Sequence, residues 1–135
     1  MKFLTWPKLC NTSQNTMSWH NEVGKIGEKL AREFLEKNGY KILEQNYKTK
    51  YAEIDLVAQK MGVLIFVEVR TKIGENFGTP EDTINKAKLR KVLWNAKSYI
   101  GYKDWPGPCR IDAVCIVLKP DFSVKRLNHY ENIIN

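Results

Sequence analysis

The stretch EIDLVAQKMGVLIFVEVRTK, residues 53–72, places two acidic side chains inside apolar sequence. Asp55 interrupts the first apolar run, and Glu68 directly follows the second run, residues 63–67. Aliphatic and aromatic residues of this kind, bounded by glycines, are typical of a buried strand. An ionised carboxylate in such surroundings costs several kcal/mol unless a cation or a proton neutralises it. The stretch therefore predicts two buried strands and poses the question of what neutralises their acids.

A tight turn between the two runs would bring the acids together. A two-residue turn at Met61-Gly62 pairs Lys60 with Val63 in an antiparallel hairpin. The same register carried outward sets Asp55 opposite Glu68 on one face of the sheet, with Cβ atoms roughly 4.5 to 5.5 Å apart. A three-residue turn would send the acids to opposite faces. We therefore expect the two carboxylates to converge.

Two sources of positive charge are available to such a pair. Side-chain alternation puts Arg70 on the same face as Glu68, where it can form an ion pair. A divalent cation can supply the rest, because Mg²⁺ prefers hard oxygen ligands and keeps several of its waters. The alternative is a purely structural ion-pair network, which is the commoner origin of neighbouring acids and cations. The residues leave both interpretations open.

Periodicity and turn residues divide the rest of the chain into helices and strands. An amphipathic helix begins at residue 23 and is ended by Asn38-Gly39, and a second helix begins at Thr79-Pro80 and ends at Gly101. Strands are predicted at residues 40–49, 53–58, 64–71, 110–118 and 124–130. This order predicts an α/β fold, a mixed β-sheet of about five strands flanked by helices. Residues 1–20 are predicted to form an irregular N-terminal arm, and residues 21–135 the folded domain.

Composition restricts the classes of partner. Lys and Arg outnumber Asp and Glu by 22 to 15, a net charge of +7, which favours polyanions such as nucleic acid. No apolar run reaches the roughly 20 residues of a membrane span, and no signal-peptide core is present. We therefore expect a soluble cytoplasmic protein with no membrane partner. The 3 cysteines lack the spacings of zinc or redox pairs.

Several short motifs together resemble a known family. The motifs are Gly24-x-x-Gly27-Glu28-x-x-Ala31, Gly39-Tyr40-x-Ile42-Leu43-x-x-Asn46, Glu53-Ile54-Asp55-Leu56, Phe66-Val67-Glu68-Val69-Arg70, Lys86 and Arg110-Ile111-Asp112. In this order they are similar to the signatures of the YraN family of small bacterial proteins, over roughly residues 21 to 132. That family belongs to the PD-(D/E)XK superfamily, so the resemblance implies a restriction-endonuclease-like fold close to that of archaeal Holliday-junction resolvases.

The resemblance also implies an activity and a set of site residues. It implies an endonuclease that depends on Mg²⁺ or Mn²⁺ and hydrolyses phosphodiester bonds in structured or branched DNA. Asp55, Glu68 and Glu28 would hold the metal. Arg70 occupies the position of the superfamily's catalytic lysine; it can hold a phosphate but cannot readily release a proton at neutral pH. The alternative is a nucleic-acid-binding module of the same fold that does not cleave.

Further basic residues are candidates for nucleic-acid contacts. Lys72 lies on the face of Arg70, and the alternative for it is a solvated lysine at a strand end. Lys86, Arg90 and Lys97 fall within about 40° of one another on the second helix. Such rows are often only solvated surface, but Lys86 matches a family position, so we expect phosphate contacts there. A homodimer is also open, because junction and flap nucleases often act as dimers.

Three smaller expectations complete the sequence-based hypothesis. Glu53 is expected to pair with a lysine, although it shares the face of Asp55 and can instead join the acidic cluster. Arg110 and Asp112 are expected to form a salt bridge that braces the sheet. The glycines of the first helix, at positions 24 and 27, indicate either close approach of another backbone or a phosphate, or a helix that starts late.

Overall fold

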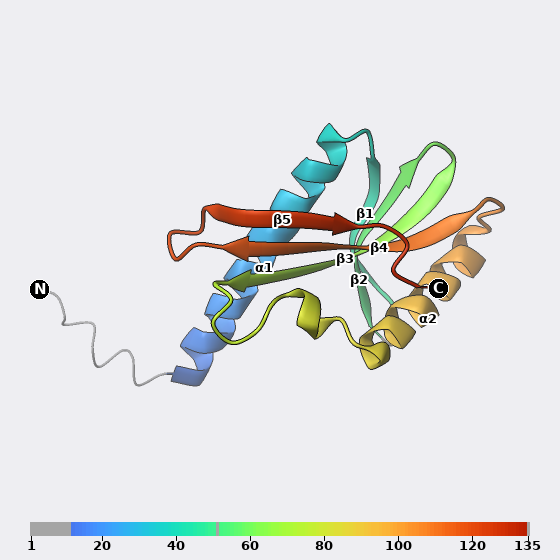
Figure 1. The fold of residues 1–135 in the computed structure, drawn as a ribbon. Coiled ribbons are helices and arrows are strands. Elements are labelled where there is room, and N and C mark those ends of the chain that lie inside the picture. The colour runs from blue at the N-terminus through green and yellow to red at the C-terminus, as the bar shows by residue number, and fades with distance from the viewer. Residues whose placement is uncertain (1–11, 51, 135) are drawn as a thin grey trace, which may run out of the picture.

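A computed structural model describes residues 12–50 and 52–134 of the chain (Figure 1). Its elements follow the predicted order of one helix, three strands, a second helix and two strands. They are α1 (Thr12–Lys37), β1 (Lys41–Lys48), β2 (Glu53–Lys60), β3 (Val63–Ile73), the 3-10 helix η2 (Glu81–Thr83), α2 (Lys86–Lys103), β4 (Cys109–Leu118) and β5 (Val124–Tyr130).

The five strands form one mixed sheet in the order β1-β2-β3-β4-β5. The pair β3 and β4 is parallel, and the other three pairs are antiparallel. A parallel pair needs a long crossover connection, and here α2 and the segment before it provide one. The predicted α/β fold with a five-stranded mixed sheet is confirmed, and it is consistent with a restriction-endonuclease-like domain.

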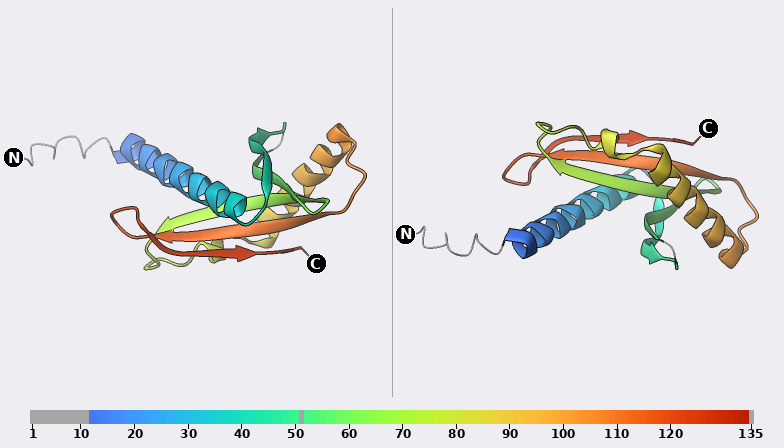
Figure 2. Two further views of the ribbon diagram at one scale, coloured as in Figure 1. Left: turned by 90° about the horizontal axis from the view of Figure 1, so that it is seen from above. Right: turned by 90° about the horizontal axis from the view of Figure 1, so that it is seen from below.

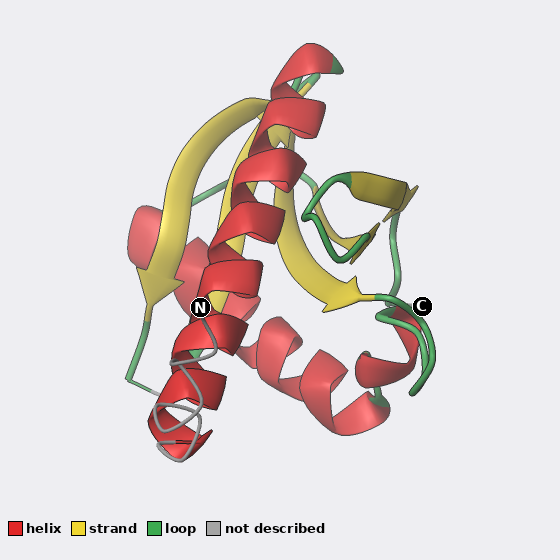
Figure 3. Cartoon of the chain, turned by 90° about the vertical axis from the view of Figure 1, so that its left-hand side faces the viewer, coloured by secondary structure: helices red, strands yellow, loops and turns green. Residues whose placement is uncertain are grey.

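The two helices cover opposite faces of the sheet (Figure 2). Alternation along β3 divides its side chains between two apolar clusters. Ile65, Val67 and Val69 face α1, which crosses in front of the strands in Figure 3. Leu64 and Phe66 face α2. Glu68, Arg70 and Lys72 continue the α2 face, so the charged end of β3 emerges beyond the apolar cluster.

The first helix is longer than predicted. It begins at Thr12, so the expectation of an irregular arm is wrong for residues 12–20, and residues 1–11 lie outside the described part of the chain. Tertiary packing accounts for part of this difference, because the Trp19 ring packs at a tilt against Phe122 in the turn between β4 and β5, with ring centroids 5.1 Å apart. Tertiary contacts of this kind override a polar local sequence.

The second helix starts later than predicted. Thr79-Pro80 opens only the short 3-10 helix η2, and α2 begins at Lys86 after the cap residue Asn85, whose side chain accepts a hydrogen bond from the Lys88 N–H group. Ile84 lies between them with φ −96° and ψ 89°, which is not helical, so the two elements cannot merge. The helix ends at Lys103 rather than at Gly101, and its first turn is displaced relative to the prediction.

None of the helices in the described residues combines the length and the apolar character that a bilayer crossing demands.

Candidate functional site

The predicted hairpin register is confirmed. Lys60 pairs with Val63, and the ladder continues to Leu56 and Val67. At the next position the side chain of Asp55 replaces a backbone partner, because its Oδ2 accepts a hydrogen bond of 2.8 Å from the Val69 N–H group. Asp55 therefore lies where the β2 and β3 ladder ends, with its carboxylate held against β3.

Three carboxylates from two elements come together around this point. Oxygen atoms of Glu28 on α1 and of Glu53 and Asp55 on β2 all lie within 4.8 Å of one another. The Asn46 amide bridges two of them, donating to Glu28 Oε1 at 2.8 Å and to Glu53 Oε1 at 3.0 Å. Glu53 thus joins the acidic cluster, the alternative to the lysine pairing that we had expected. We call Glu28, Glu53 and Asp55 the carboxylate cluster.

Glu68 lies beside this cluster but is turned towards cations. Its side chain is only 3% exposed, and its Oε2 lies 3.2 Å from Lys88 Nζ and 3.4 Å from Arg70 Nη1. The ion pair with Arg70 was predicted, whereas Lys88 was not. Lys88 lies on the core-facing side of α2, so helical periodicity could have placed it near the sheet. It was missed because the predicted start of that helix was wrong.

The electrostatics of the cluster reflect surplus negative charge. Burial, followed by repulsion from Glu68, raises the pKa of Asp55 to about 8, against the Val69 hydrogen bond and the Lys88 charge, which lower it. Burial is also the main cause that raises the pKa of Glu28, with Glu53 and Glu68 adding to it. The two cations therefore do not neutralise all the acids, and the remaining charge favours a bound proton or a bound cation.

The acids and the cations open into one cavity of about 540 Å³. Its charged lining comprises Glu28, Asp55, Glu68, Arg70, Lys72 and Lys88. Lys72 Nζ donates to the Phe77 carbonyl oxygen at 3.4 Å, so this lysine is held near the loop before η2. Anionic and cationic groups thus face the same accessible space, an arrangement suited to a phosphate together with a cation.

The position of Arg70 depends on η2. Arg70 Nε donates to Thr83 Oγ1 at 2.7 Å, and the Thr83 hydroxyl in turn donates to the Pro80 carbonyl oxygen at 2.6 Å. The last residue of η2 therefore fixes one edge of the guanidinium, which leaves Nη1 for Glu68. The Thr79-Pro80 motif has a structural role here that differs from the predicted helix start.

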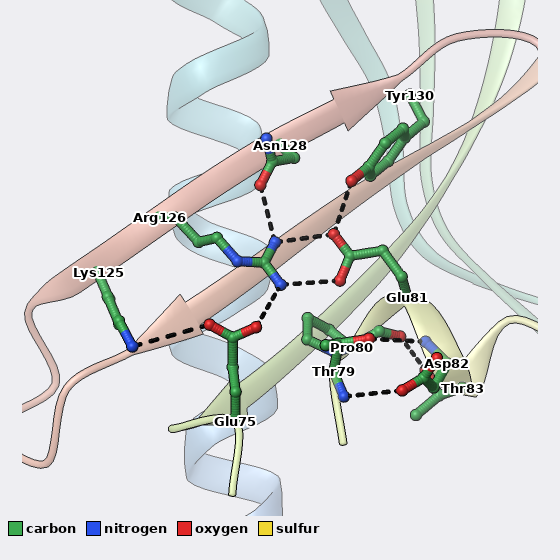
Figure 4. Close-up of polar contacts among 10 residues, drawn as sticks. All are labelled: Glu75, Thr79, Pro80, Glu81, Asp82, Thr83, Lys125, Arg126, Asn128 and Tyr130. Atoms are coloured by element: carbon green, nitrogen blue, oxygen red, sulfur yellow. Dashed lines mark hydrogen bonds and ion pairs between the residues drawn. The ribbon is translucent and has the colours of Figure 1, made fainter.

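Arg126 on β5 anchors the loop that carries η2 (Figure 4). Its guanidinium donates to both oxygens of Glu81 at 2.8 and 2.9 Å and to Glu75 Oε2 at 3.0 Å. The hydrogen bond from Arg126 is the largest cause that lowers the pKa of Glu81 to about 2, and one from Tyr130 adds to it. This loop is therefore fastened to the sheet, and Thr83 is fastened with it.

The α1 glycines have different surroundings. A Cβ atom on Gly27 would lie 2.8 Å from Thr71 Cβ and closer still to Thr71 Oγ1, so close approach explains this glycine. A Cβ atom on Gly24 would meet nothing within 4 Å. Close approach of another backbone is therefore wrong for Gly24 among the described residues, whereas approach of a phosphate to Gly24 stays a prediction. A late helix start is wrong for both glycines. The contact at Gly27 sets α1 near β3, which brings the adjacent Glu28 to Asp55.

The predicted row on α2 lies away from the cavity. At about 100° per residue, Lys86, Arg90 and Lys97 project roughly 160° to 180° from Lys88 around the helix. None of the three lines the cavity, and Arg90 lines a separate hollow on the outer side of α2. Contact of these side chains with nucleic acid remains a prediction.

Arg110 and Asp112 form the predicted salt bridge. Asp112 is 0% exposed, and its two oxygens accept from Arg110 at 3.0 and 3.2 Å. His129 Nε2 at 2.8 Å and the Asn132 N–H group at 3.0 Å complete its surroundings. The groups around this carboxylate thus come from β4, from β5 and from the segment that follows β5, as a bracing role requires.

Most of the chain matches a defined family. The model of the family described as Uncharacterised protein family UPF0102 matches residues 27–116. The chain belongs to this family. This membership confirms the resemblance to the YraN family, which is UPF0102.

Several bacterial members of the UPF0102 family are similar to this chain. A UPF0102 protein of Flavobacterium johnsoniae is 46% identical over 88 residues, which cover 65% of this chain and 72% of the relative. One from Flavobacterium psychrophilum is 37% identical over 86% of this chain and 96% of the relative. One from Lawsonia intracellularis is 40% identical over 83% of this chain and 84% of the relative.

Proposed function

We propose that this UPF0102 protein is a Mg²⁺- or Mn²⁺-dependent endonuclease that hydrolyses phosphodiester bonds in structured or branched DNA. The observation that carries the proposal is the shared cavity, in which two members of the carboxylate cluster, Glu28 and Asp55, lie opposite cations. Those cations are Arg70, Lys72 and Lys88. A phosphodiester needs positive charge around its oxygens, and hydrolysis needs an activated water beside it.

The donor set fits a hard divalent cation. Glu28, Glu53 and Asp55 offer only carboxylate oxygens within 4.8 Å of one another, and Mg²⁺ and Mn²⁺ prefer oxygen ligands. The raised pKa of Asp55 supports the same reading, since a carboxylate that retains a proton near neutral pH favours a cation in its place. When bound, such a cation would supply Lewis-acid chemistry and lower the pKa of a water.

The cationic side chains have distinct parts in the proposal. Arg70, fixed by Thr83 and Glu68, presents a charge that cannot be lost at neutral pH and so binds and orients the phosphate. Lys88, 34% exposed, presents its ammonium group at the cavity and can also transfer a proton, which Arg70 cannot. Glu68 orients both cations, which is a different part from the metal ligation implied by the resemblance.

The test is cleavage of labelled single-stranded, duplex, flap and four-way DNA with Mg²⁺, with Mn²⁺ and with EDTA. Asp55→Asn keeps an acceptor for the Val69 N–H group and should lower cleavage by about 100-fold or more. Glu28→Gln should also lose activity, whereas Glu33→Gln, an exposed residue on the same helix, should match the wild type. No metal-dependent cleavage of any substrate would refute the endonuclease.

A second candidate is a module of the same fold that binds nucleic acid without cleaving it. It is favoured by Glu68, whose charge Lys88 and Arg70 already neutralise. This candidate expects salt-dependent binding that persists in EDTA and in Asp55→Asn. Binding without cleavage would select it, and the absence of both would refute the two candidates together.

A further inference from the structure

The outer side of α2 exposes a large aromatic ring. Trp94 lies in the middle of the helix and is 62% exposed. Single exposed apolar residues are common on protein surfaces and carry no meaning by themselves. The charged residues and the hollow around Trp94 distinguish this ring from such isolated residues.

The helix around Trp94 carries cations and no acidic residue. Its basic residues are Lys86, Lys88, Arg90, Lys91, Lys97 and Lys103. Lys88 and Lys103 form ion pairs with Glu68 and Glu44. At 3.6 residues per turn, Arg90 and Lys97 lie about 40° and 60° to one side of Trp94, and Lys91 lies about 60° to the other. We call Arg90, Lys91, Trp94 and Lys97 the α2 platform.

The ring borders a hollow large enough for a ligand. The hollow measures about 510 Å³ and is lined by Ala52, Ala87, Arg90, Lys91 and Trp94. The two alanines carry short side chains, so they leave space beside the ring. The volume falls in the range of roughly 300 to 1,000 Å³ that small-molecule sites occupy. A flat apolar group can therefore lie against Trp94 with a cation on each side.

We propose that the α2 platform binds single-stranded nucleic acid, with an unpaired base stacked on Trp94 and neighbouring phosphates on Arg90, Lys91 and Lys97. An aromatic ring for the base, with cations for the backbone, is how single strands are held without sequence readout. Bases in a duplex are stacked on each other and cannot lie on the ring. The platform extends the proposed function, on which it rests, by naming unpaired strands as the class of substrate, held on the outer side of α2.

Binding in EDTA separates this proposal from cleavage. The probe is a fluorescein-labelled oligothymidine, and fluorescence anisotropy gives the dissociation constant. Trp94→Ala should weaken binding about tenfold, and Trp94→Phe should recover most of the loss. Tyr102→Ala is the matched control, because Tyr102 is 75% exposed on the same helix, and it should change binding less than twofold. Binding of a blunt duplex should not respond to Trp94→Ala.

The salt dependence distinguishes the ring from the cations. Each phosphate contact removed from a single strand should lower the slope of log K against log salt concentration by about 0.7. Arg90→Gln and Lys91→Gln should therefore reduce the slope, whereas Trp94→Ala should leave it unchanged while it lowers the affinity. This pattern would not follow from a general loss of folding, which circular dichroism of each variant checks independently.

Four outcomes would overturn the platform. They are wild-type affinity in Trp94→Ala, equal losses in Trp94→Ala and Tyr102→Ala, no oligothymidine binding by the wild-type chain, and a change in self-association rather than oligonucleotide binding in Trp94→Ala. Failure of the proposed endonuclease is separate, because it would leave the EDTA binding pattern intact and remove only metal-dependent cleavage.

Discussion

The contact between Gly27 and Thr71 predicts that a single methyl group will disturb the fold near the site. Gly27→Ala adds a Cβ atom only 2.8 Å from Thr71 Cβ, so α1 and β3 must separate. Because Glu28 follows directly in α1, the same movement shifts its carboxylate relative to Asp55. Gly24→Ala is the matched control, since it makes the same substitution in the same helix where a Cβ atom meets nothing within 4 Å.

The magnitude follows from two opposing contributions. Replacing glycine by alanine inside a helix stabilises it by about 1 kcal/mol, and this applies to both variants. Overpacking a well-packed contact costs about 1 to 3 kcal/mol, and this applies only to Gly27→Ala. We therefore expect Gly24→Ala to raise the free energy of unfolding by up to about 1 kcal/mol, and Gly27→Ala to lie about 1 to 3 kcal/mol below it.

Urea unfolding at pH 7, followed by circular dichroism, measures both variants against the wild type. The double variant Gly27→Ala/Thr71→Ala should recover part of the loss, because it removes Thr71 Oγ1 but keeps the Cβ atom. Thr71→Ala alone should cost little, since Thr71 Oγ1 is buried and has no hydrogen-bond partner among the described residues. Equal stability of Gly27→Ala and Gly24→Ala would refute the reasoning.

Three further predictions concern buried and paired charges. Asp55→Asn should stabilise the metal-free protein above pH 8, by an amount on the order of 1 to 3 kcal/mol in thermal unfolding. The reason is that the raised pKa of Asp55 makes the wild type lose stability as pH rises from about 4 to about 8. A stabilisation that is largest at pH 4 would contradict this. Asp112→Ala should lower the free energy of unfolding in urea by about 3 to 5 kcal/mol, because it leaves Arg110 without its buried partner. A loss below about 1 kcal/mol would show that the polar contacts of Asp112 are dispensable for stability. Arg126→Gln should lower the free energy of unfolding by no more than about 1 kcal/mol at pH 7, since the ion pair with Glu81 is partly exposed. This difference should vanish as pH falls from about 4.5 to about 2, where Glu81 becomes protonated in both the folded and the unfolded state. A difference that persists below pH 2 would assign the effect to packing.

The sequence predicted the part of the site that depends on neighbours along the chain. The two-residue turn at Met61-Gly62 sets the register of the hairpin, and Gly62 has the positive φ of 78° that such a turn requires. Once the register is set, alternation determines that Glu68 and Arg70 share a face. The ion pair of these two residues was predictable for this reason.

The residues that contact this hairpin from other elements were harder to predict from the sequence. Glu28 was named through the family resemblance, but its approach to Asp55 depends on Gly27 allowing α1 to lie against Thr71. Lys88 was missed because its position relative to Glu68 depends on the start of α2, and the non-helical Ile84 moved that start. Neither fact is contained in the periodicity of one segment.

The sequence by itself determined the order of the elements, the hairpin register and the presence of acids at a strand end, because each depends on backbone preferences and side-chain alternation over a few residues. Only the tertiary structure decided that Glu53 joins Asp55 and Glu28 while Glu68 turns to Lys88, and that Arg126 fixes the loop holding Arg70. Those choices are made between residues distant in sequence, where the packing of α1, α2 and β5 on the sheet sets which charges come within a few ångströms.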